Sequence, residues 1–218
     1  MKIFLASSSF DDVRWAAACG FLDGVLVSAA LLDSEVSGAQ AHALELTRLF
    51  GCPVILSLGS HDAEELCREA RELSRTTDQV MLEFPLAIDT VEGLHKAMSD
   101  GMQVAASMVF TSAQAWLAAK AGASAVLIHM GALEAQGQNA RSTLAEMRAI
   151  FDVQRLECEI IAVRPGSAGE VAACAACGVD AVVLEVTVLR DLLLHPLADR
   201  TLDALLQPSH GATRARAI

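Results

Sequence analysis

The fold is decided by a repeated unit whose last copy reads Gly178-Val179-Asp180-Ala181-Val182-Val183-Leu184. A glycine follows a helix-like segment, and a short aliphatic run begins three residues later. The same order occurs in Gly122-Ala123-Ser124-Ala125-Val126. Glycine after a helix supplies the left-handed backbone that ends it. An aliphatic run without polar alternation is typical of a parallel strand that is buried on both faces.

Working outward from this unit, eight aliphatic runs occur along the chain, at a spacing that fits one strand and one helix each. The predicted strands are residues 3–6, 24–27, 54–58, 80–84, 103–108, 125–130, 160–163 and 181–184. Amphipathic segments separate most of them. The predicted helices are residues 40–50, 62–74, 90–99, 111–121, 141–152, 168–177, 187–194 and 196–206.

Eight buried strands alternating with helices favour a (β/α)8 TIM barrel with an extra C-terminal helix. The rival is an open doubly wound sheet, but no Gly-x-Gly-x-x-Gly motif follows an early strand. No linker rich in Pro, Gly or Ser interrupts the series, so we expect one domain over residues 1–206. Residues 207–218 are expected to form a flexible tail.

Composition narrows the possible partners and the compartment. The chain of 218 residues has 16 Lys and Arg against 27 Asp and Glu, a net charge of -11. That balance argues against binding to nucleic acid or to an anionic membrane surface. No apolar run approaches the roughly 20 residues of a membrane-spanning helix, and the N-terminus lacks the pattern of a signal peptide. Six scattered cysteines indicate free thiols in a reducing cytoplasm.

In a TIM barrel, function lies at the carboxyl ends of the strands. The residues at or just after these ends are Ala6, Ser28, Ser57, Glu83, Ser107, His129, Arg164 and Glu185. We expect Ser28, Ser57, Ser107 and Arg164 to contact a small ligand. Glu83 and His129 are candidates for acid/base chemistry. The alternative is that Glu83 and Arg164 only neutralise each other.

Other motifs carry little chemistry. The Cys174-Ala175-Ala176-Cys177 stretch has the spacing of a redox or metal site. It lies at the end of an Ala-rich helix, however, and no second pair of cysteines accompanies it. The favoured interpretation is therefore that both cysteines pack in the protein core. Residues 131–139 are predicted to form a long loop beside the site. No motif for a metal or a cofactor occurs, and we expect neither.

At this level of detail the chain resembles the small transaldolases, the group that contains fructose-6-phosphate aldolase. The resemblance covers nearly the whole chain. It is carried by Ile3-Phe4-Leu5-Ala6-Ser7-Ser8, Gly24-Val25-Leu26-Val27-Ser28, Glu83-Phe84-Pro85-Leu86, Glu134-Ala135-Gln136-Gly137 and His195-Pro196. It implies a barrel that makes and breaks carbon–carbon bonds through a Schiff base on a lysine at the end of strand four. The residue in that place is Glu83, and a carboxylate cannot form an iminium.

The resemblance also implies changes at the other functional positions. Ala6 stands where the family has a proton-transferring aspartate, and Ser28 where an asparagine supports the lysine. His129 replaces a tyrosine, Ala132 a phosphate-binding arginine, and Arg164 a serine that also contacts phosphate. Ser107 matches the Ser or Thr of the family.

No other lysine is placed to act instead. Lys2 precedes the first strand, and Lys96 and Lys120 fall on outer helices. We therefore expect a divergent barrel that binds a sugar-phosphate-like or carboxylate ligand without Schiff-base chemistry. The alternative is an inactive structural subunit of a ring assembly. The resemblance implies a homo-oligomer, a pentamer or decamer, and the apolar side chains of residues 197–206 would suit a last helix that docks on a neighbour.

Overall fold

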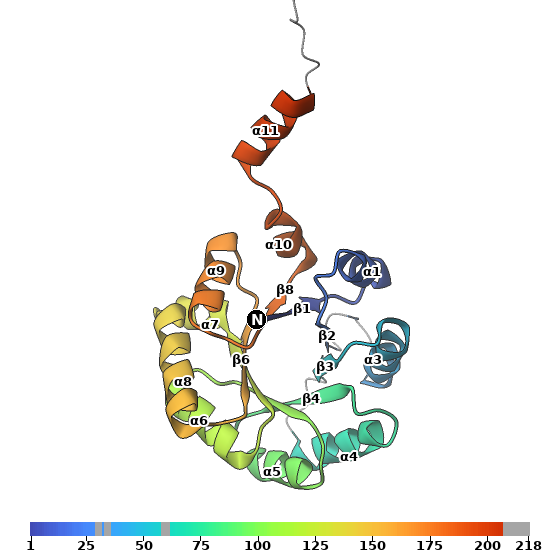
Figure 1. Cartoon of the computed structure of the whole chain (residues 1–218). Helices are drawn as coiled ribbons and strands as arrows, with labels where there is room; N and C mark the ends of the chain where they lie inside the picture. The colour runs from blue at the N-terminus through green and yellow to red at the C-terminus, as the bar shows by residue number, and fades with distance from the viewer. Residues whose placement is uncertain (29–31, 33–35, 58–61, 207–218) are drawn as a thin grey trace, which may run out of the picture.

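A computed structural model describes residues 1–28, 32, 36–57 and 62–206. Within them, eight parallel strands form a closed barrel in chain order, so the predicted TIM barrel is confirmed (Figure 1). The strands are β1 (Lys2–Ala6), β2 (Gly24–Ser28), β3 (Val54–Ser57), β4 (Val80–Pro85), β5 (Val104–Ser107), β6 (Ala125–His129), β7 (Glu159–Val163) and β8 (Ala181–Leu184). The first and last strands pair in register, with Lys2 opposite Ala181, and this pairing closes the barrel.

Helices surround the barrel and cover the outward faces of its strands (Figure 1). They are α1 (Phe10–Ala18), α3 (Val36–Phe50), α4 (Ala63–Ser74), α5 (Val91–Ser99), α6 (Ser112–Ala121), α7 (Met130–Ala135), α8 (Ala140–Gln154), α9 (Ala168–Ala176) and α10 (Val186–Asp191). A further helix, α11 (Pro196–Leu206), follows them and does not cover the barrel. The backbone is left-handed at Gly122 (φ 105°) and at Gly178 (φ 74°), as the repeated unit predicts. Residues 207–218 and Leu58, the last residue of the third predicted strand, lie outside the described residues.

The sequence analysis missed one helix and treated another as a loop. Helix α1 begins after Ser9, whose hydroxyl accepts a hydrogen bond from the Asp12 amide at 3.3 Å. This is an ordinary N-cap followed by acidic residues in the first turn. The predicted loop 131–139 contains α7, a helix of 6 residues. It is too short to show a hydrophobic period in the sequence.

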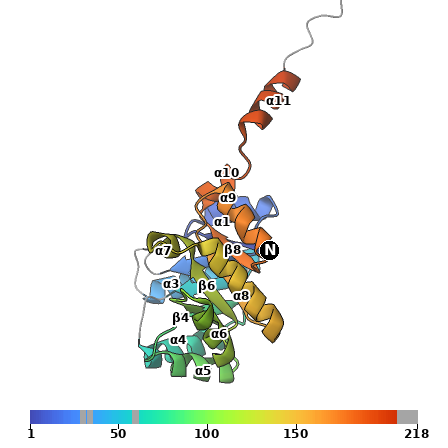
Figure 2. The same ribbon diagram turned by 90° about the vertical axis from the view of Figure 1, so that its left-hand side faces the viewer.

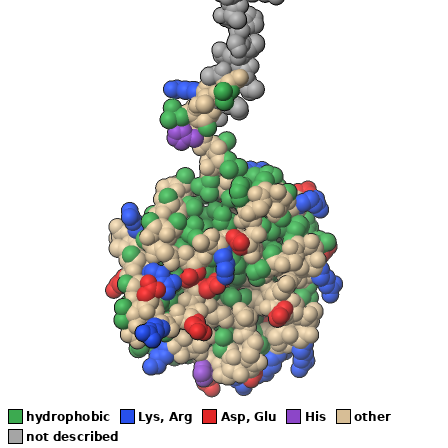
Figure 3. Space-filling model, viewed as in Figure 1, with side chains coloured by type: hydrophobic (Ala, Val, Ile, Leu, Met, Phe, Trp, Pro, Cys, Tyr) green, Lys and Arg blue, Asp and Glu red, His purple; other side chains and the backbone are tan. Residues whose placement is uncertain are grey.

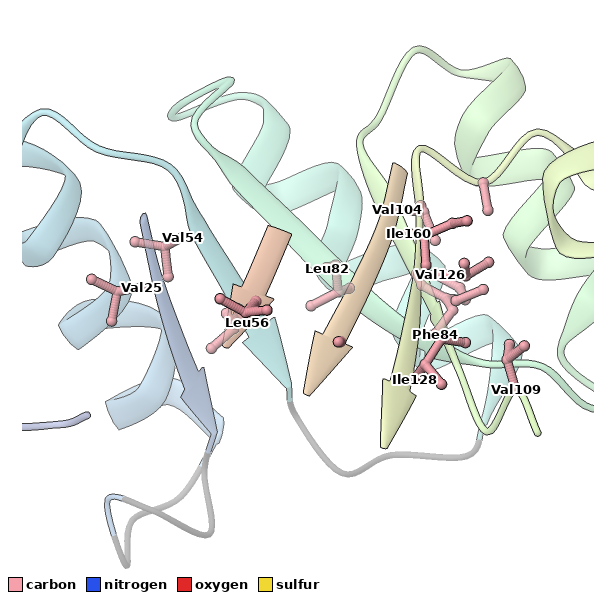
Figure 4. Close-up of a cluster of buried hydrophobic side chains, with 14 of the residues drawn as sticks. Val25, Val54, Leu56, Leu82, Phe84, Val104, Val109, Val126, Ile128 and Ile160 are labelled. Atoms are coloured by element: carbon pink, nitrogen blue, oxygen red, sulfur yellow. The ribbon is translucent and has the colours of Figure 1, made fainter. Parts of the chain in front are cut away.

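Two apolar layers hold the barrel together. Alternate strand residues face outward onto the helices, and Figure 4 shows this layer, which includes Leu82 and Phe84 of β4. The intervening residues fill the barrel itself, among them Phe4, Leu26 and Leu127. Because side chains alternate along a strand, the position two residues beyond an interior residue also points into the barrel.

Gly24 shows how tightly the lower end of the barrel is filled. A Cβ atom on Gly24 would lie 2.2 Å from Cε1 of Phe4, which is far inside van der Waals contact. The Phe4 ring, only 5% exposed, therefore occupies the space that a side chain on β2 would otherwise take. The upper part of the barrel is lined by smaller side chains, beginning with Ala6 and Ala105.

Helix α11 stands apart from the rest of the chain. Figures 1 and 2 show it projecting away from the barrel beyond α10. Leu197 is 62% exposed and Leu205 is 76% exposed. Leucines this exposed, on a helix without a described partner, form an unusually apolar free surface for a chain by itself. In the part of the chain that the structure describes, no helix has the length and apolar character needed to cross a bilayer.

Candidate functional site at the carboxyl end of the barrel

The candidate site lies at the carboxyl end of the strands, on the side of the barrel opposite the N-terminus (Figure 2). Five polar side chains follow an interior residue by two positions and so point into the same end. These pairs are Leu26 and Ser28, Ile55 and Ser57, Met81 and Glu83, Ala105 and Ser107, and Leu127 and His129. Strand alternation, together with closure of the barrel, brings them around one opening.

The three serines form a ring of hydroxyl groups on one side of this end. Ser28 lies opposite Ser57 in the pairing of β2 with β3. Ser107 lies opposite Pro85 in the pairing of β4 with β5, and it is 3% exposed. Hydroxyl groups donate and accept hydrogen bonds, so this side can contact the hydroxyl or carbonyl oxygens of a polar ligand.

Glu83 provides a carboxylate at the end of β4. Its residue is half-buried, and it lies opposite Ala105 in the pairing of β4 with β5. Among the described residues, no hydrogen bond or ion pair engages the Glu83 carboxylate. A carboxylate that is partly removed from water and has no donor is poised to accept hydrogen bonds from a ligand.

Arg164 pairs with a different acid from the one that the sequence suggests. Its Nε lies 3.6 Å from Oε1 of Glu185, which follows β8, and both side chains are about half exposed. Within the described ranges no ion pair joins Arg164 to Glu83, so the structure does not have the alternative arrangement in which these two groups neutralise each other. Glu185 precedes α10 at a position two residues beyond the interior residue Val183, which places its carboxylate within reach of Arg164.

Two residues at this end have an unusual backbone conformation. Met108 and Arg164 directly follow β5 and β7, and each has a φ angle of 56°. Side chains other than glycine adopt this left-handed conformation at a cost, and such strain clusters at functional sites. The Arg164 amide is fixed by a hydrogen bond that it donates to the Val183 carbonyl at 2.9 Å.

His129 ends β6 between the two charged groups. Burial lowers the pKa of its imidazole below the ordinary value of 6.5; the Glu83 carboxylate raises it, and the Arg164 guanidinium lowers it. Both charges therefore act on the pKa of the ring, and with a pKa below 6.5 the ring is mainly neutral at pH 7. A neutral imidazole can accept a proton as well as donate a hydrogen bond, so the site can in principle exchange protons with a ligand.

The lowered pKa of His129 has a consequence for stability. Below the ordinary pKa of 6.5 the unfolded chain protonates this group and the folded chain resists protonation, so stability falls as the pH drops. We expect His129→Gln to flatten this dependence between about pH 5 and 7, and NMR titration of the wild-type imidazole to give a pKa below 6.5. His195→Gln, at an exposed position, controls for the substitution itself. A pKa at or above the ordinary value would contradict the prediction.

None of the three lysines lies at this end of the barrel. Lys2 begins β1 at the opposite end, where its Nζ lies 2.6 Å from Oε1 of Glu159. Figure 3 shows that opposite face, on which acidic and basic side chains are interspersed. Lys96 and Lys120 are exposed on the outer helices α5 and α6, and Nζ of Lys120 lies 5.4 Å from the centre of the Trp116 ring. Ala132 lies exposed on α7.

The comparisons with known proteins agree with this geometry. Eight parallel strands that close in chain order, with a helix after each, define a TIM barrel. Residues 53–216 match the family model described as Transaldolase/Fructose-6-phosphate aldolase. A "Probable transaldolase" from Hyphomonas neptunium is 31% identical over 97% of this chain and 98% of its own. A "Probable transaldolase" from Chelativorans sp. is 30% identical over 94% of this chain and 95% of its own. Another, from Alkaliphilus metalliredigens, is 27% identical over 98% of this chain and 100% of its own. The chain belongs to the transaldolase/fructose-6-phosphate aldolase family.

Proposed function

We propose that this protein is a divergent member of the family that binds a small sugar-phosphate-like or carboxylate ligand at the carboxyl end of the barrel, without Schiff-base chemistry. The observation that carries the proposal is the position of Glu83, which by family resemblance occupies the place of the amine-bearing lysine. The positions of Lys2, Lys96 and Lys120 support it, because all three lie on the far end or on outer helices.

In this proposal the residues divide into contacts and proton-transfer groups. The Arg164 guanidinium binds the anionic group of the ligand, and the hydroxyls of Ser28, Ser57 and Ser107 contact its oxygens. Glu83 and His129 exchange protons with it. Glu83 can accept a proton as a carboxylate, and neutral His129 can return one, which is the division of roles that acid/base chemistry requires.

A thermal-shift screen of sugar phosphates and small carboxylic acids tests ligand binding. A bound ligand at roughly 100 times its Kd is expected to raise the Tm by about 5 to 10 °C. Arg164→Ala is expected to abolish this rise because it removes the anion contact. Arg14→Ala changes an exposed arginine on α1 and is expected to keep the rise. A screen without any stabilised ligand would count against the proposal.

We also propose that the protein is a homo-oligomer in which α11 docks on a neighbouring copy. The projecting position of α11 supports this, as do Leu197 and Leu205 on it and the exposed Leu193 and Leu194 before it. Figure 3 shows hydrophobic side chains gathered where α11 leaves the barrel. The same features favour the second candidate function, an inactive structural subunit of a ring assembly, and mixing with a relative that has the lysine would reveal joint rings.

Sedimentation measures the assembly directly. The wild-type protein is expected to sediment at a multiple of 23.0 kDa. Joint replacement of Leu197 and Leu205 by Ser is expected to lower that mass, because it removes the apolar contacts of α11. Ala198→Ser, on the same helix and also exposed, is the matched control and should leave the mass unchanged. A wild-type protein at the mass of a single chain would overturn the proposal.

We further propose a cytoplasmic location. All six cysteines are free, and four of them, Cys52, Cys67, Cys158 and Cys174, are buried. Burial raises the pKa of the Cys174 thiol to about 11. This thiol therefore remains protonated and unreactive at neutral pH, which supports the packing interpretation of the Cys174 and Cys177 pair.

A further inference from the structure

At the carboxyl end of the barrel, one acid forms an ion pair with an arginine, and another acid forms none with any described residue. Arg164 and Glu185 form the pair, at 3.6 Å. Glu83 stands apart on β4, half-buried and without a hydrogen bond or ion pair among the residues that the structure describes. Glu83, Glu185 and Arg164 together are two acids against one guanidinium, so these three groups carry a net negative charge. A purely anionic ligand gains attraction at Arg164 but meets repulsion at Glu83.

Glu83 needs a donor that the described protein does not provide. A half-buried carboxylate is stabilised most by hydrogen bonds from a positively charged group, which are about twice as strong as neutral ones. Met81 below it on β4 and Ala105 opposite it on β5 cannot donate a hydrogen bond, and Ser57, which follows the Leu56–Leu82 pair on β3, makes none to it in the described structure. His129 is neutral and already offers at most one N–H. A ligand ammonium would fill this role.

Arg164 keeps part of its guanidinium available. Glu185 lies nearest to Nε, and the two terminal nitrogens form no ion pair with another acid among residues 1–28, 32, 36–57 and 62–206. These two nitrogens form the fork that binds a carboxylate or a phosphate. The half-exposed ion pair with Glu185 draws the guanidinium toward the end of β8.

We propose that the ligand carries two opposite charges, a protonated amine that pairs with Glu83 and an anionic group that pairs with Arg164, as in an amino sugar phosphate. This inference rests on the proposed function and specifies its ligand class. The serine hydroxyls and the His129 imidazole lie around the same opening and contact the hydroxyl groups of the ligand. Glu185 is a positioning residue, since it acts on the ligand only through Arg164.

Isothermal titration calorimetry with three matched probes tests the inference. Glucose 6-phosphate, glucosamine 6-phosphate and N-acetylglucosamine 6-phosphate share ring and phosphate, and only glucosamine 6-phosphate has an ammonium group. We expect the wild-type protein to bind glucosamine 6-phosphate at least about tenfold more tightly than the other two, as one added charge-assisted hydrogen bond predicts. This preference should weaken above about pH 8, where the amine of the probe loses its proton.

Variants assign the preference to Glu83. Glu83→Gln keeps the size of the side chain and is expected to reduce the preference to about one, because it removes the charge. Glu92→Gln, an exposed acid on α5, is the matched control and should retain the full preference. Glu185→Gln is expected to weaken the binding of all three probes by the same factor, so that the ratio of their affinities stays unchanged. A role in folding alone would not produce this pattern in a folded variant. Circular dichroism confirms that each variant is folded.

The outcomes separate this inference from the proposed function. Equal binding of the three probes would overturn the inference and leave the proposed anion-binding function intact. Tighter binding of glucose 6-phosphate than of glucosamine 6-phosphate would do the same. Absence of binding by all three, together with a flat thermal-shift screen, would overturn both. If Glu83→Gln still prefers glucosamine 6-phosphate, the ammonium group of the probe binds to another residue, and this result would contradict the inference.

Discussion

Treatment with dihydroxyacetone and sodium borohydride is expected to leave the mass of the wild-type protein unchanged. A Schiff base requires a primary amine that condenses with the ketone, and borohydride then fixes the adduct. Glu83 cannot condense. Lys2 lies at the far end of the barrel in an ion pair with Glu159, and Lys96 and Lys120 are exposed on outer helices, away from the carboxyl end of the barrel. Intact-mass spectrometry gives the result directly.

Glu83→Lys is the informative counterpart. It places an amine at the end of β4, on the interior face and half-buried, and partial burial favours the neutral amine that attacks a carbonyl. We expect this variant to accumulate an adduct of one ketone per chain. Glu92→Lys, on the exposed face of α5, controls for random modification and should not. A stoichiometric adduct on the wild-type protein would contradict the absence of Schiff-base chemistry.

Phe84→Ala is expected to lower the free energy of unfolding by about 3 to 5 kcal/mol and the Tm by roughly 6 to 20 °C. Phe84 is fully buried, at 0% exposed, in the layer between the strands and the helices (Figure 4). Its removal deletes a large apolar surface and leaves a cavity that the rigid barrel cannot close. Chemical denaturation followed by circular dichroism measures the loss.

Ile88→Ala is the matched control for that substitution. Ile88 lies four residues further along the chain but is 92% exposed, so its truncation should change stability by less than about 0.5 kcal/mol. Phe84→Leu should give an intermediate loss, because it keeps part of the apolar volume. Equal effects of Phe84→Ala and Ile88→Ala would contradict the packing of β4 described above.

The fold could be predicted because its signals are local and repeated. Each strand is a short aliphatic run, and glycines such as Gly122 and Gly178 mark the ends of helices through a backbone conformation that few other residues adopt. Helix α1 was not predicted because its buried positions, Val13 and Ala16, are few and one is small. Helix α7 was not predicted because its 6 residues do not span two helical turns.

The candidate site was only partly predictable. Strand ends can be read from the sequence, so Glu83, His129 and Arg164 could be named in advance. The pairing of Arg164 with Glu185 could not, since it depends on the left-handed backbone at Arg164 and on the orientation of a long side chain. One signal was available: β7 and β8 are neighbours in the barrel, so the residues that follow them end side by side.

Closure of the barrel through β1 and β8 has a consequence for synthesis of the protein. Lys2 pairs with Ala181, so the first strand waits for nearly the whole chain before its second neighbour exists. Until β8 leaves the ribosome, β1 and β7 each present an open sheet edge with free N–H and C=O groups. Contacts this distant in sequence slow folding. The nascent chain is therefore most prone to aggregate just before its last strand is made, and a truncation before residue 181 should yield aggregated rather than partly active protein.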